Sequence, residues 1–492
     1  MKYAAVVEAL KPYLQQCLGP EKDICGIAYD SRQVEPGFVF VAIAGQQADG
    51  HDFIAQAADR GAALIIAQRR TKLPDNVGLL LVSDSRRALA VLSAAFYAYP
   101  DRRLRLIGVT GTNGKTTTTN LIKYLLERAG HKSGVVGTVG GLAGDKPLPE
   151  LLSASTTPES LELYRLFGAM AEQGCDYAVI EASSHALDQG RVSACRFVGA
   201  VFTNLTQDHL DYHKTMEAYG QAKAGLFAMT DPWQGYGVVN VDDPHADYFT
   251  KACRSKLYTY GQSEGAELRL LHYSASMRGM DFSLSWAGNV YDLHIPLIGR
   301  FNIYNAMAAV ATALAEGLAM EDVVKWLADA PQVPGRFELV DEGQPFAVVV
   351  DYAHTPDGLE NVLKTARSLK PRRLIAVFGC GGNRDTTKRP IMGRLAGQYA
   401  DVAVLTSDNP RFEDPQEIIA MVERGMREVC NNYLVEADRG RAVELAINLA
   451  QTGDIVLLAG KGHEDYQLIR GEKHHFDDRE EARRVLRAKM SK

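Results

Sequence analysis

The residues best suited to chemistry form a glycine-rich stretch that ends in a lysine and two threonines. It reads G-V-T-G-T-N-G-K-T-T over residues 108–117, after an apolar run and before a helical pattern at 118–129. Backbone N–H groups of such a loop can approach phosphates, and the helix N-terminus adds partial positive charge. We expect Lys115 to bridge the β- and γ-phosphates of a nucleotide and the Thr116 hydroxyl to bind Mg²⁺. The strict motif has glycine where this chain has Val109, so the stretch matches a variant with glycines at 108 and 111.

Two further polar stretches follow apolar runs in the middle of the chain. Glu181 ends the run at 177–180, where nucleotide-using enzymes place a metal-orienting acid or a base near the γ-phosphate. By itself it is equally well read as a solvated strand end, but the phosphate loop upstream favours function. His209 and His213 are four residues apart, yet a zinc-protease motif needs glutamate where this chain has Leu210. A histidine near Mg²⁺ and a solvated loop both remain open there.

Four charged loops follow apolar runs in the last third of the chain, at 351–357, 379–385, 407–411 and 459–464. Arg384 and Arg411 stand beside Asp408 and Glu464 in these loops. Arginine can bind a carboxylate through two N–H donors, and the acids can accept hydrogen bonds from an ammonium. The set therefore suits a zwitterionic ligand. Arg384 occupies the third glycine position of a G-x-G-x-x-G pattern, which argues against a dinucleotide fingerprint.

The elements that must position these residues are short apolar runs alternating with helical patterns. The runs lie at 104–109, 177–180, 200–202, 346–350, 374–378, 402–405 and 455–458. The runs are rich in valine and isoleucine and do not alternate apolar with polar residues, which is typical of strands buried on both faces. Strand–helix alternation predicts an α/β fold with parallel sheets and ligands at the carboxyl ends of the strands. The polar stretches follow these runs, as that rule requires.

The length of 492 residues predicts about three domains, because one hydrophobic core rarely serves so long a chain. Proline-containing polar stretches at 99–103 and 330–336 are the candidate joints. We therefore predict a small α/β domain at 1–100, a central P-loop sheet at 101–332 and a Rossmann-like domain at 333–492.

Composition excludes several protein classes. The chain is 46% hydrophobic and 23% charged, and 54 basic against 60 acidic residues give a net charge of −6, which argues against broad nucleic-acid binding. The seven cysteines are scattered without a C-x-x-C pair, as in a reducing compartment. The first residues read as an amphipathic helix, and no apolar run reaches the ~20 residues of a membrane span. We expect a cytoplasmic monomer without membrane insertion or nucleic-acid partner.

Eight motifs together resemble the Mur ligase family, in that family's order and across nearly the whole chain. They are G-V-T-G-T-N-G-K-T, E-A-S-S-H-A-L, T-N-L-T-Q-D-H-L-D-Y-H, G-R-F-N-I-Y-N-A, P-G-R-F-E, D-Y-A-H-T-P-D, G-C-G-G-N-R-D and S-D-N-P-R. The resemblance implies an ATP- and Mg²⁺-dependent ligase of peptidoglycan biosynthesis. It would add meso-2,6-diaminopimelate to UDP-N-acetylmuramoyl-L-alanyl-D-glutamate through an acyl phosphate, with ADP and phosphate as products.

The resemblance also implies roles for individual residues. The expected catalytic residues are Lys115, Glu181, His209 and Lys223, and Mg²⁺ would contact Thr116, Glu181, His209 and Lys223. Lys223, which in isolation reads as a surface lysine, matches the family's carbamylated lysine (N6-carboxylysine). The expected ATP contacts are Gly111, Thr112, Asn113, Gly114, Lys115, Thr116, Thr117, Asn302, Arg336, Asp351 and His354.

Two further sets of residues match the family's substrate contacts. The expected UDP-muramoyl-dipeptide contacts are Tyr29, Ser31, Gln46, Gln47, Ala48, Thr156, Thr157, Ser183, Gln189 and Arg191. The expected diaminopimelate contacts are Arg384, Asp408, Asn409, Pro410, Arg411, Gly460 and Glu464. Ser155 departs from the asparagine of some relatives, which weakens the assignment at that position only.

Four alternative functions remain to be separated. A lysine-adding ligase of the same family is the nearest, but such relatives usually lack the arginine that stands here as Arg411. A folylpolyglutamate synthetase should lack both the first domain with its Asp30-Ser31-Arg32 stretch and the D-N-P-R loop. A P-loop motor or switch would have no use for an amino-acid pocket. A sugar-nucleotide sensor would not need Lys115, Glu181, His209 and Lys223.

Overall fold

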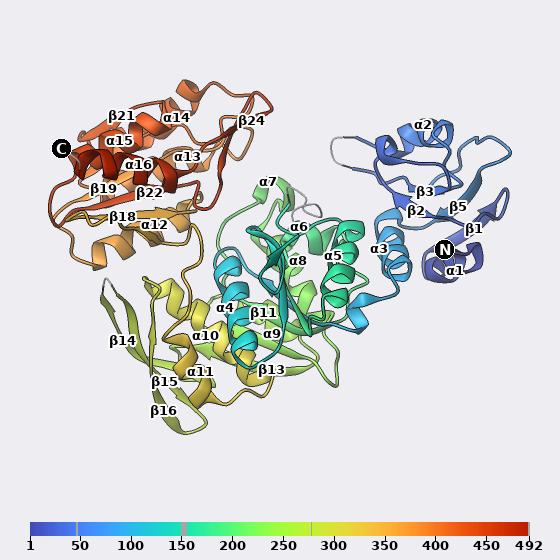
Figure 1. Ribbon diagram of the computed structural model, residues 1–492, viewed down its shortest axis with the longest axis horizontal. Coiled ribbons are helices and arrows are strands. Elements are labelled where there is room, and N and C mark those ends of the chain that lie inside the picture. Colours follow the sequence, from blue (N-terminus) through green and yellow to red (C-terminus); the bar gives the residue numbers. More distant parts are fainter. Residues whose placement is uncertain (46–47, 149–154, 277, 491–492) are drawn as a thin grey trace.

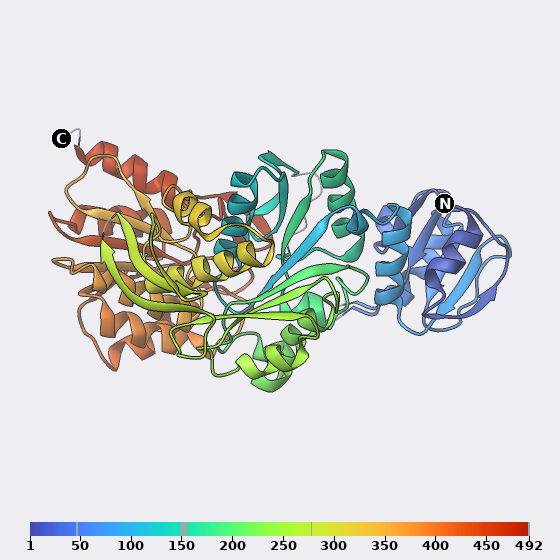
Figure 2. The ribbon, with the colours of Figure 1, turned by 90° about the horizontal axis from the view of Figure 1, so that it is seen from below.

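The computed structural model describes residues 1–45, 48–148, 155–276 and 278–490. Three large sheets follow one another in chain order along the longest axis of the molecule, each with its own helices (Figures 1 and 2). A fourth sheet, of two strands, belongs to the C-terminal region. The N-terminal and C-terminal regions lie at opposite ends and the central region lies between them (Figure 1). The predicted α/β fold is confirmed.

The N-terminal region is a five-stranded sheet in the order β1-β5-β4-β3-β2, parallel except for β1. Apolar side chains on its two faces pack against α1 and α3 on one side and α2 on the other. Its elements are α1 (Tyr3–Leu10), β1 (Leu14–Leu18), β2 (Gly26–Ala28), η1 (Ser31–Gln33), β3 (Phe38–Val41), η2 (Gly50–Phe53), α2 (Ile54–Asp59), β4 (Leu64–Ala67), β5 (Gly78–Val82), α3 (Ser85–Phe96) and η3 (Pro100–Arg102).

The central region is an eleven-stranded sheet in the order β16-β15-β14-β13-β12-β11-β6-β10-β7-β8-β9. Helices α4, α10 and α11 cover one face, and α5, α8 and α9 cover the other. Its elements are β6 (Arg105–Thr110), α4 (Lys115–Arg128), β7 (Ser133–Gly137), β8 (Gly140–Ala143), β9 (Lys146–Pro147), α5 (Ser160–Glu172), β10 (Tyr177–Glu181), α6 (Ser184–Asp188), β11 (Phe197–Phe202), α7 (Leu210–His213), α8 (Met216–Ala228), β12 (Tyr236–Asn240), α9 (Ala246–Ala252), β13 (Lys256–Gly261), β14 (Leu268–Ser276), β15 (Gly279–Trp286), β16 (Asn289–Ile295), α10 (Arg300–Ala315) and α11 (Met320–Leu327).

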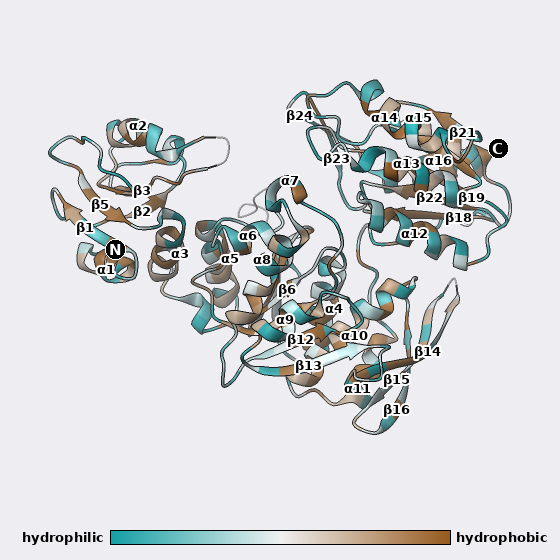
Figure 3. Ribbon diagram, turned by 180° about the vertical axis from the view of Figure 1, so that it is seen from behind, coloured by the Kyte–Doolittle hydropathy of each residue, from teal (hydrophilic) through white to brown (hydrophobic). Residues whose placement is uncertain are grey.

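The C-terminal region is a six-stranded sheet in the order β17-β18-β22-β19-β20-β21, parallel except for β17. Apolar strands such as β22 lie between helices whose outer faces are polar (Figure 3). Its elements are β17 (Glu338–Val340), β18 (Ala347–Asp351), α12 (Pro356–Ser368), β19 (Leu374–Phe378), α13 (Lys388–Tyr399), β20 (Val402–Leu405), α14 (Pro415–Arg427), β21 (Tyr433–Val435), α15 (Arg439–Leu449), β22 (Ile455–Ala459), β23 (Tyr466–Ile469), β24 (Glu472–His475) and α16 (Asp478–Met490).

Three local details differ from the sequence prediction. Helix α4 begins at Lys115, three residues before the predicted range, because Gly114 forms its N-cap at φ 85°. The stretch at 99–103 is not simply a polar joint, since it forms η3 and leaves Asp101 only 3% exposed. Antiparallel strands β14–β16 extend the parallel sheet. They were not predicted because they are partly exposed rather than continuous buried apolar runs.

Candidate functional site

The glycine-rich stretch connects the carboxyl end of β6 to the first residue of α4, as predicted. Gly111 has φ 150° and Gly114 has φ 85°. A Cβ atom on Gly111 would collide with the Thr203 hydroxyl, and one on Gly114 with the Asn305 side chain. Because neither position has room for a side chain, both glycines are needed for the loop to keep its shape. Helix α4 directs its N-terminus at this loop, which suits a bound phosphate.

Two lysines contact the same carbonyl of this loop. The Lys115 ammonium donates to the carbonyl oxygens of Gly111 and Thr112 at 2.8 and 2.9 Å. Lys223, on α8, donates to the Gly111 carbonyl at 2.8 Å and is only 1% exposed. Burial, reinforced by the Lys115 charge, lowers the pKa of Lys223 well below its usual value. The site therefore favours the neutral, nucleophilic form of the Lys223 amine.

The predicted metal ligands provide oxygen atoms beside the loop. Glu181 ends β10 at 1% exposure, and its carboxylate accepts from the Thr138 backbone N–H at 2.9 Å and from its hydroxyl at 3.1 Å. The Thr116 hydroxyl accepts from Arg336 at 2.9 Å. The described residues contain no group of three His, Cys, Asp or Glu able to hold a metal. Mg²⁺ at nucleotide sites takes one or two carboxylates plus phosphate oxygens, so Thr116 and Glu181 fit a metal that arrives with ATP.

The third predicted metal ligand, His209, belongs to a cluster of rings. Its ring centroid lies 4.7 Å from that of His185 and 6.2 Å from that of Tyr219, and its Nε2 lies 3.4 Å from an Asp208 oxygen. Burial lowers the pKa of His209 to about 4. The imidazole is therefore neutral near pH 7, the state in which histidine binds a metal. His209 adopts φ 54°, a strained backbone conformation for a residue with a side chain.

The remaining predicted nucleotide contacts fall into two groups. Asn302 and Asp351 are buried and already hydrogen-bonded within the protein: Asn302 donates to the Ile298 carbonyl, and Asp351 accepts from the N–H groups of Phe337 and Ala353. The other group is Arg336 and His354, at the boundary of the C-terminal region. The Arg336 guanidinium lies 4.7 Å from the centre of the Tyr352 ring, and His354 is exposed.

Contacts across that boundary reach the phosphate loop. Asn113 donates to Asp357 at 2.6 Å, and the Arg336 contact with Thr116 joins residues 220 positions apart. Thr112 and Thr117, also predicted for ATP, are buried in the loop and in the first turn of α4. The structure thus places Arg336 and the start of α12 beside the phosphate loop.

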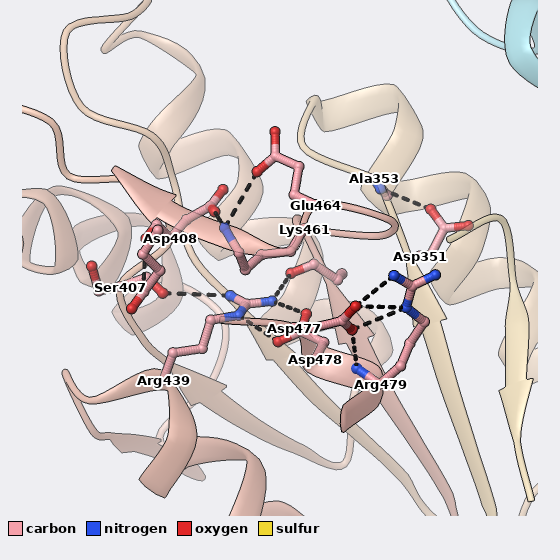
Figure 4. Close-up of polar contacts among 12 residues, drawn as sticks. Asp351, Ala353, Ser407, Asp408, Arg439, Lys461, Glu464, Asp477, Asp478 and Arg479 are labelled. Atoms are coloured by element: carbon pink, nitrogen blue, oxygen red, sulfur yellow. Dashed lines mark hydrogen bonds and ion pairs between the residues drawn. The ribbon is translucent and has the colours of Figure 1, made fainter. Parts of the chain in front are cut away.

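The predicted amino-acid pocket lies at the carboxyl ends of β20 and β22 (Figure 4). Asp408 and Asn409 follow β20 and are 6% and 5% exposed, and the Asn409 amide donates to Glu464 at 2.8 Å. Gly460 has φ 120°, and a Cβ there would lie 3.4 Å from an Asp408 oxygen. Burial raises the pKa of Glu464. The two acids and the amide therefore form one polar cluster.

The predicted arginines lie near this cluster but do not pair with its acids. Arg411 adopts φ 54° and donates to the Gly382 carbonyl at 2.8 Å, while Arg384 is exposed. Burial, followed by the nearby Arg384 charge, lowers the pKa of Arg411. Pro410 connects Asn409 to Arg411. Arg411 is thus not engaged with a protein carboxylate in these contacts.

Three buried charges in this region were missed by the sequence analysis. Lys461 has a fully buried side chain between Asp408 and Glu464. Arg439 and Asp478 form a fully buried ion pair of 2.6 Å behind the loops (Figure 4). Lys461 stands in a strand-end loop and could have been flagged by its position. Nothing local marks Arg439 and Asp478, which begin α15 and α16.

The predicted uridine-diphosphate contacts lie in the segments that follow β2 and β3 of the N-terminal region. The Tyr29 hydroxyl donates to Glu162 at 2.8 Å, which links the N-terminal and central regions, and the Ser31 hydroxyl donates to Gln56. The Ala48 carbonyl accepts from Gly45. Gln46 and Gln47 lie outside the described residues.

The predicted dipeptide contacts form a connected polar group in the central region. The Thr157 hydroxyl lies 3.1 Å from that of Ser183, and Thr156 accepts from Thr138. Arg191 donates to Gln189 and to the Thr157 carbonyl. Through Thr138 and Thr157, this group contacts Glu181.

Comparisons with known proteins agree with this arrangement. Residues 109–313 match the Mur ligase middle domain, 335–462 the glutamate ligase domain of Mur ligases, and 23–97 the Mur ligase family catalytic domain. A protein of Geobacillus thermodenitrificans named UDP-N-acetylmuramoyl-L-alanyl-D-glutamate–2,6-diaminopimelate ligase is 48% identical over 474 residues, 95% of this chain and 96% of the relative. A protein of the same name from Syntrophomonas wolfei is 46% identical over the full length of both chains. A solved structure under that name is 36% identical, with a TM-score of 0.67 over 95% of each chain.

Among the described residues, no helix is both long enough and apolar enough to span a bilayer.

Proposed function

Because the chain belongs to the Mur ligase family, we propose that it joins meso-2,6-diaminopimelate to UDP-N-acetylmuramoyl-L-alanyl-D-glutamate at the expense of ATP. The observation that carries this proposal is the pairing of a phosphate loop with a pocket of two acids, an amide and a separate arginine. Asp408 and Glu464 suit an ammonium, and Arg411 suits a carboxylate. Diaminopimelate presents both groups at its distal centre, whereas lysine presents the ammonium alone.

The proposed reaction has two steps. The side-chain carboxylate of the substrate's D-glutamate attacks the γ-phosphorus of ATP and releases ADP, which gives an acyl phosphate. The neutral diaminopimelate amine then attacks that carbonyl, its nitrogen gives up one proton, and phosphate leaves with that proton as the amide forms. A free carboxylate is a poor acylating agent, so the first step supplies the leaving group. Positioning and charge neutralisation are the protein's main contributions.

Individual side chains serve these steps through their charges. Lys115 can move from the loop carbonyls onto the β- and γ-phosphates, and Arg336 can move from Thr116 onto the nucleotide. Thr116, Glu181 and His209 would hold Mg²⁺, which would neutralise charge between the two anions. The remaining residues assigned from the family resemblance complete the proposed contacts.

Lys223 is the proposed site of carbamylation. The neutral amine attacks CO₂, a C–N bond forms and the nitrogen releases one proton, so a neutral group becomes a carbamate anion. The lowered pKa of Lys223 favours this step because only the free amine is nucleophilic. A carbamate would also place a negative charge near Lys115, and it would add an oxygen donor toward the metal.

We further propose that the protein is a cytoplasmic monomer in which segments 1–100, 101–332 and 333–492 each bind a different ligand. The first segment would hold the uridine diphosphate, the second ATP, and the third the amino acid. This assignment is supported by the three sheets and by the polar contacts between them, such as those of Tyr29 and Asn113. Binding of all three ligands would require the segments to close on one another.

The function is tested by phosphate release from ATP with UDP-N-acetylmuramoyl-L-alanyl-D-glutamate and either diaminopimelate, lysine or no amino acid. We expect release with diaminopimelate, little with lysine and none without an amino acid. Equal or faster release with lysine would favour the lysine-adding alternative. Release that needs no amino acid would favour a P-loop motor or switch, and no release at all would favour a sensor.

Arg411 provides the sharper test of the amino acid. Arg411→Ala should raise the KM for diaminopimelate by about 10- to 100-fold, because a carboxylate loses its partner, while the KM for ATP stays within about 3-fold. Arg470→Ala is the matched control, since Arg470 also has a left-handed backbone, at φ 51° against 54°, and is exposed. Unchanged diaminopimelate kinetics in Arg411→Ala would overturn the assignment.

A further inference from the structure

Lys461 is a lysine with no exposed side-chain surface, at the centre of the polar cluster that follows β20 and β22. Its ammonium lies 3.4 Å from Asp408 Oδ1, 3.3 Å from Asn409 Oδ1 and 3.3 Å from Glu464 Oε2 (Figure 4). An ammonium has three N–H donors, so each donor has one acceptor here. All three acceptors belong to residues of the proposed diaminopimelate pocket.

The contacts of Lys461 determine which atoms of the pocket stay available. Asn409 Oδ1 also accepts from the Leu468 backbone, and its Nδ2 donates to the same Glu464 oxygen, Oε2. These contacts engage one oxygen of each acid and leave Asp408 Oδ2 and Glu464 Oε1 as the second oxygens. Those oxygens are suited to the incoming ammonium of an amino acid.

The charge of Lys461 also matters to the cluster. Asp408 and Glu464 are two carboxylates in one largely buried site. Burial raises the pKa of Glu464, the Lys461 ammonium opposes that rise and the Asp408 charge adds to it. With Lys461 between them the three groups carry a net charge of −1, which matches a single substrate ammonium. Without Lys461 the two carboxylates would have no cation between them, and their charge would exceed that of a single substrate ammonium.

A second buried cation, Arg439, contacts the backbone of the same two loops. Arg439 donates to the carbonyl oxygens of Ser407 and Ala459, the residues just before Asp408 and Gly460. Arg439 thus binds the backbone at the start of both loops, whereas the hydrogen bonds of the Lys461 ammonium go to side-chain oxygens.

We propose that Lys461 is a positioning residue for amino-acid binding, which orients Asp408, Asn409 and Glu464 toward the distal centre of diaminopimelate. This proposal rests on the proposed function. The residue acts through the pocket side chains and does not itself contact the reacting atoms.

The test compares Lys461→Met with Lys473→Met in the full-length enzyme. Both ammonium groups lie over the Tyr466 ring, at 5.7 and 4.4 Å from its centroid, but Lys473 is exposed. We expect Lys461→Met to raise the KM for diaminopimelate about 100-fold, while kcat at saturating diaminopimelate and the KM values for ATP and the UDP substrate stay within about 3-fold. Lys473→Met should leave all four values unchanged.

Lys461→Gln is the second variant, should Lys461→Met fail to fold. Its amide keeps donors without the charge, so we expect a smaller rise, about 10-fold, in the same KM alone. A KM for diaminopimelate within 2-fold of wild type in either folded variant would overturn the proposal. So would an equal rise of all three KM values, which indicates general damage. A wild-type chain that does not use diaminopimelate would instead overturn the proposed function, so the two failures are distinguishable.

Discussion

The phosphate loop and the proposed amino-acid pocket both lie at the carboxyl ends of parallel strands, but they are built in different ways. The loop depends on backbone: two glycines with positive φ leave room for Thr203 and Asn305, and its carbonyls receive Lys115 and Lys223. The pocket depends on side-chain charge: Lys461 contacts two acids, and Arg439 pairs with Asp478 behind them.

This difference follows from the ligands that each site would hold. Phosphate is recognised well by backbone N–H groups and a helix N-terminus, which any sequence with the right glycines supplies. A zwitterion needs positive and negative partners at fixed positions, and buried charges hold such positions only if each is paired. Four experiments test this difference between the two sites, in order of decreasing expected effect.

The largest effect is expected from breaking the buried ion pair of the pocket. Arg439→Met leaves Asp478 buried without its partner and should lower the local free energy of unfolding by about 3–5 kcal/mol. Hydrogen exchange of the β22 and α16 amides measures this change locally. Tryptophan fluorescence would not report on it, because the three tryptophans all lie in the central region. The double variant Arg439→Met/Asp478→Leu should recover most of the loss. If the single variant exchanges like wild type, the pair does not stabilise the pocket.

The second effect concerns charge at the phosphate loop. Lys223→Met removes the amine that we propose is carbamylated, and kcat should fall about 100- to 1000-fold, as for loss of one strong electrostatic contact in a transition state. Phosphate release in the presence of diaminopimelate measures this fall. ¹³C NMR with labelled CO₂ should show a carbamate signal in wild type and none in the variant. A wild-type spectrum without that signal would contradict carbamylation.

The third effect tests whether the loop depends on glycine. Gly114→Ala places a methyl group against the Asn305 side chain and strains φ 85°, so the KM for ATP should rise about 10-fold. Gly130→Ala is the control, because its φ is 91° and its Cβ would meet nothing within 4 Å. That variant bears the backbone strain without the collision and should bind ATP normally. Equal KM values for the two variants would show that space beside Asn305 does not matter.

The smallest effect is expected from an exposed pair in the same C-terminal region. Arg394 and Glu428 are 41% and 54% exposed, so their ion pair is well solvated. Arg394→Met should change the free energy of unfolding by at most about 1 kcal/mol, measured by the same hydrogen-exchange method. If Arg394→Met lowered the free energy of unfolding as much as Arg439→Met, burial would not explain how much each ion pair stabilises the protein.

The strand ends and the phosphate loop could be predicted from sequence because their signals are local. Apolar runs of five or so residues mark buried strands, and glycines followed by lysine and threonine mark the loop. The predicted run at 177–180 is part of β10 and that at 455–458 is part of β22. The short range of these signals also explains the errors, since the half-exposed strands β14–β16 have no comparable pattern.

By itself, the sequence determined the fold class, the family and the order of the polar loops along the chain. Only the tertiary structure decided which charges are buried and what they touch. Lys223 meets Gly111 across 112 positions, and Arg439 meets Asp478 across 39. The physical reason is that burial, and with it the lowered pKa of Lys223 and the dependence of each ion on its partner, depends on what packs over a residue. No local pattern encodes that packing, so the burial of Lys461 cannot be read from the residues next to it in the sequence.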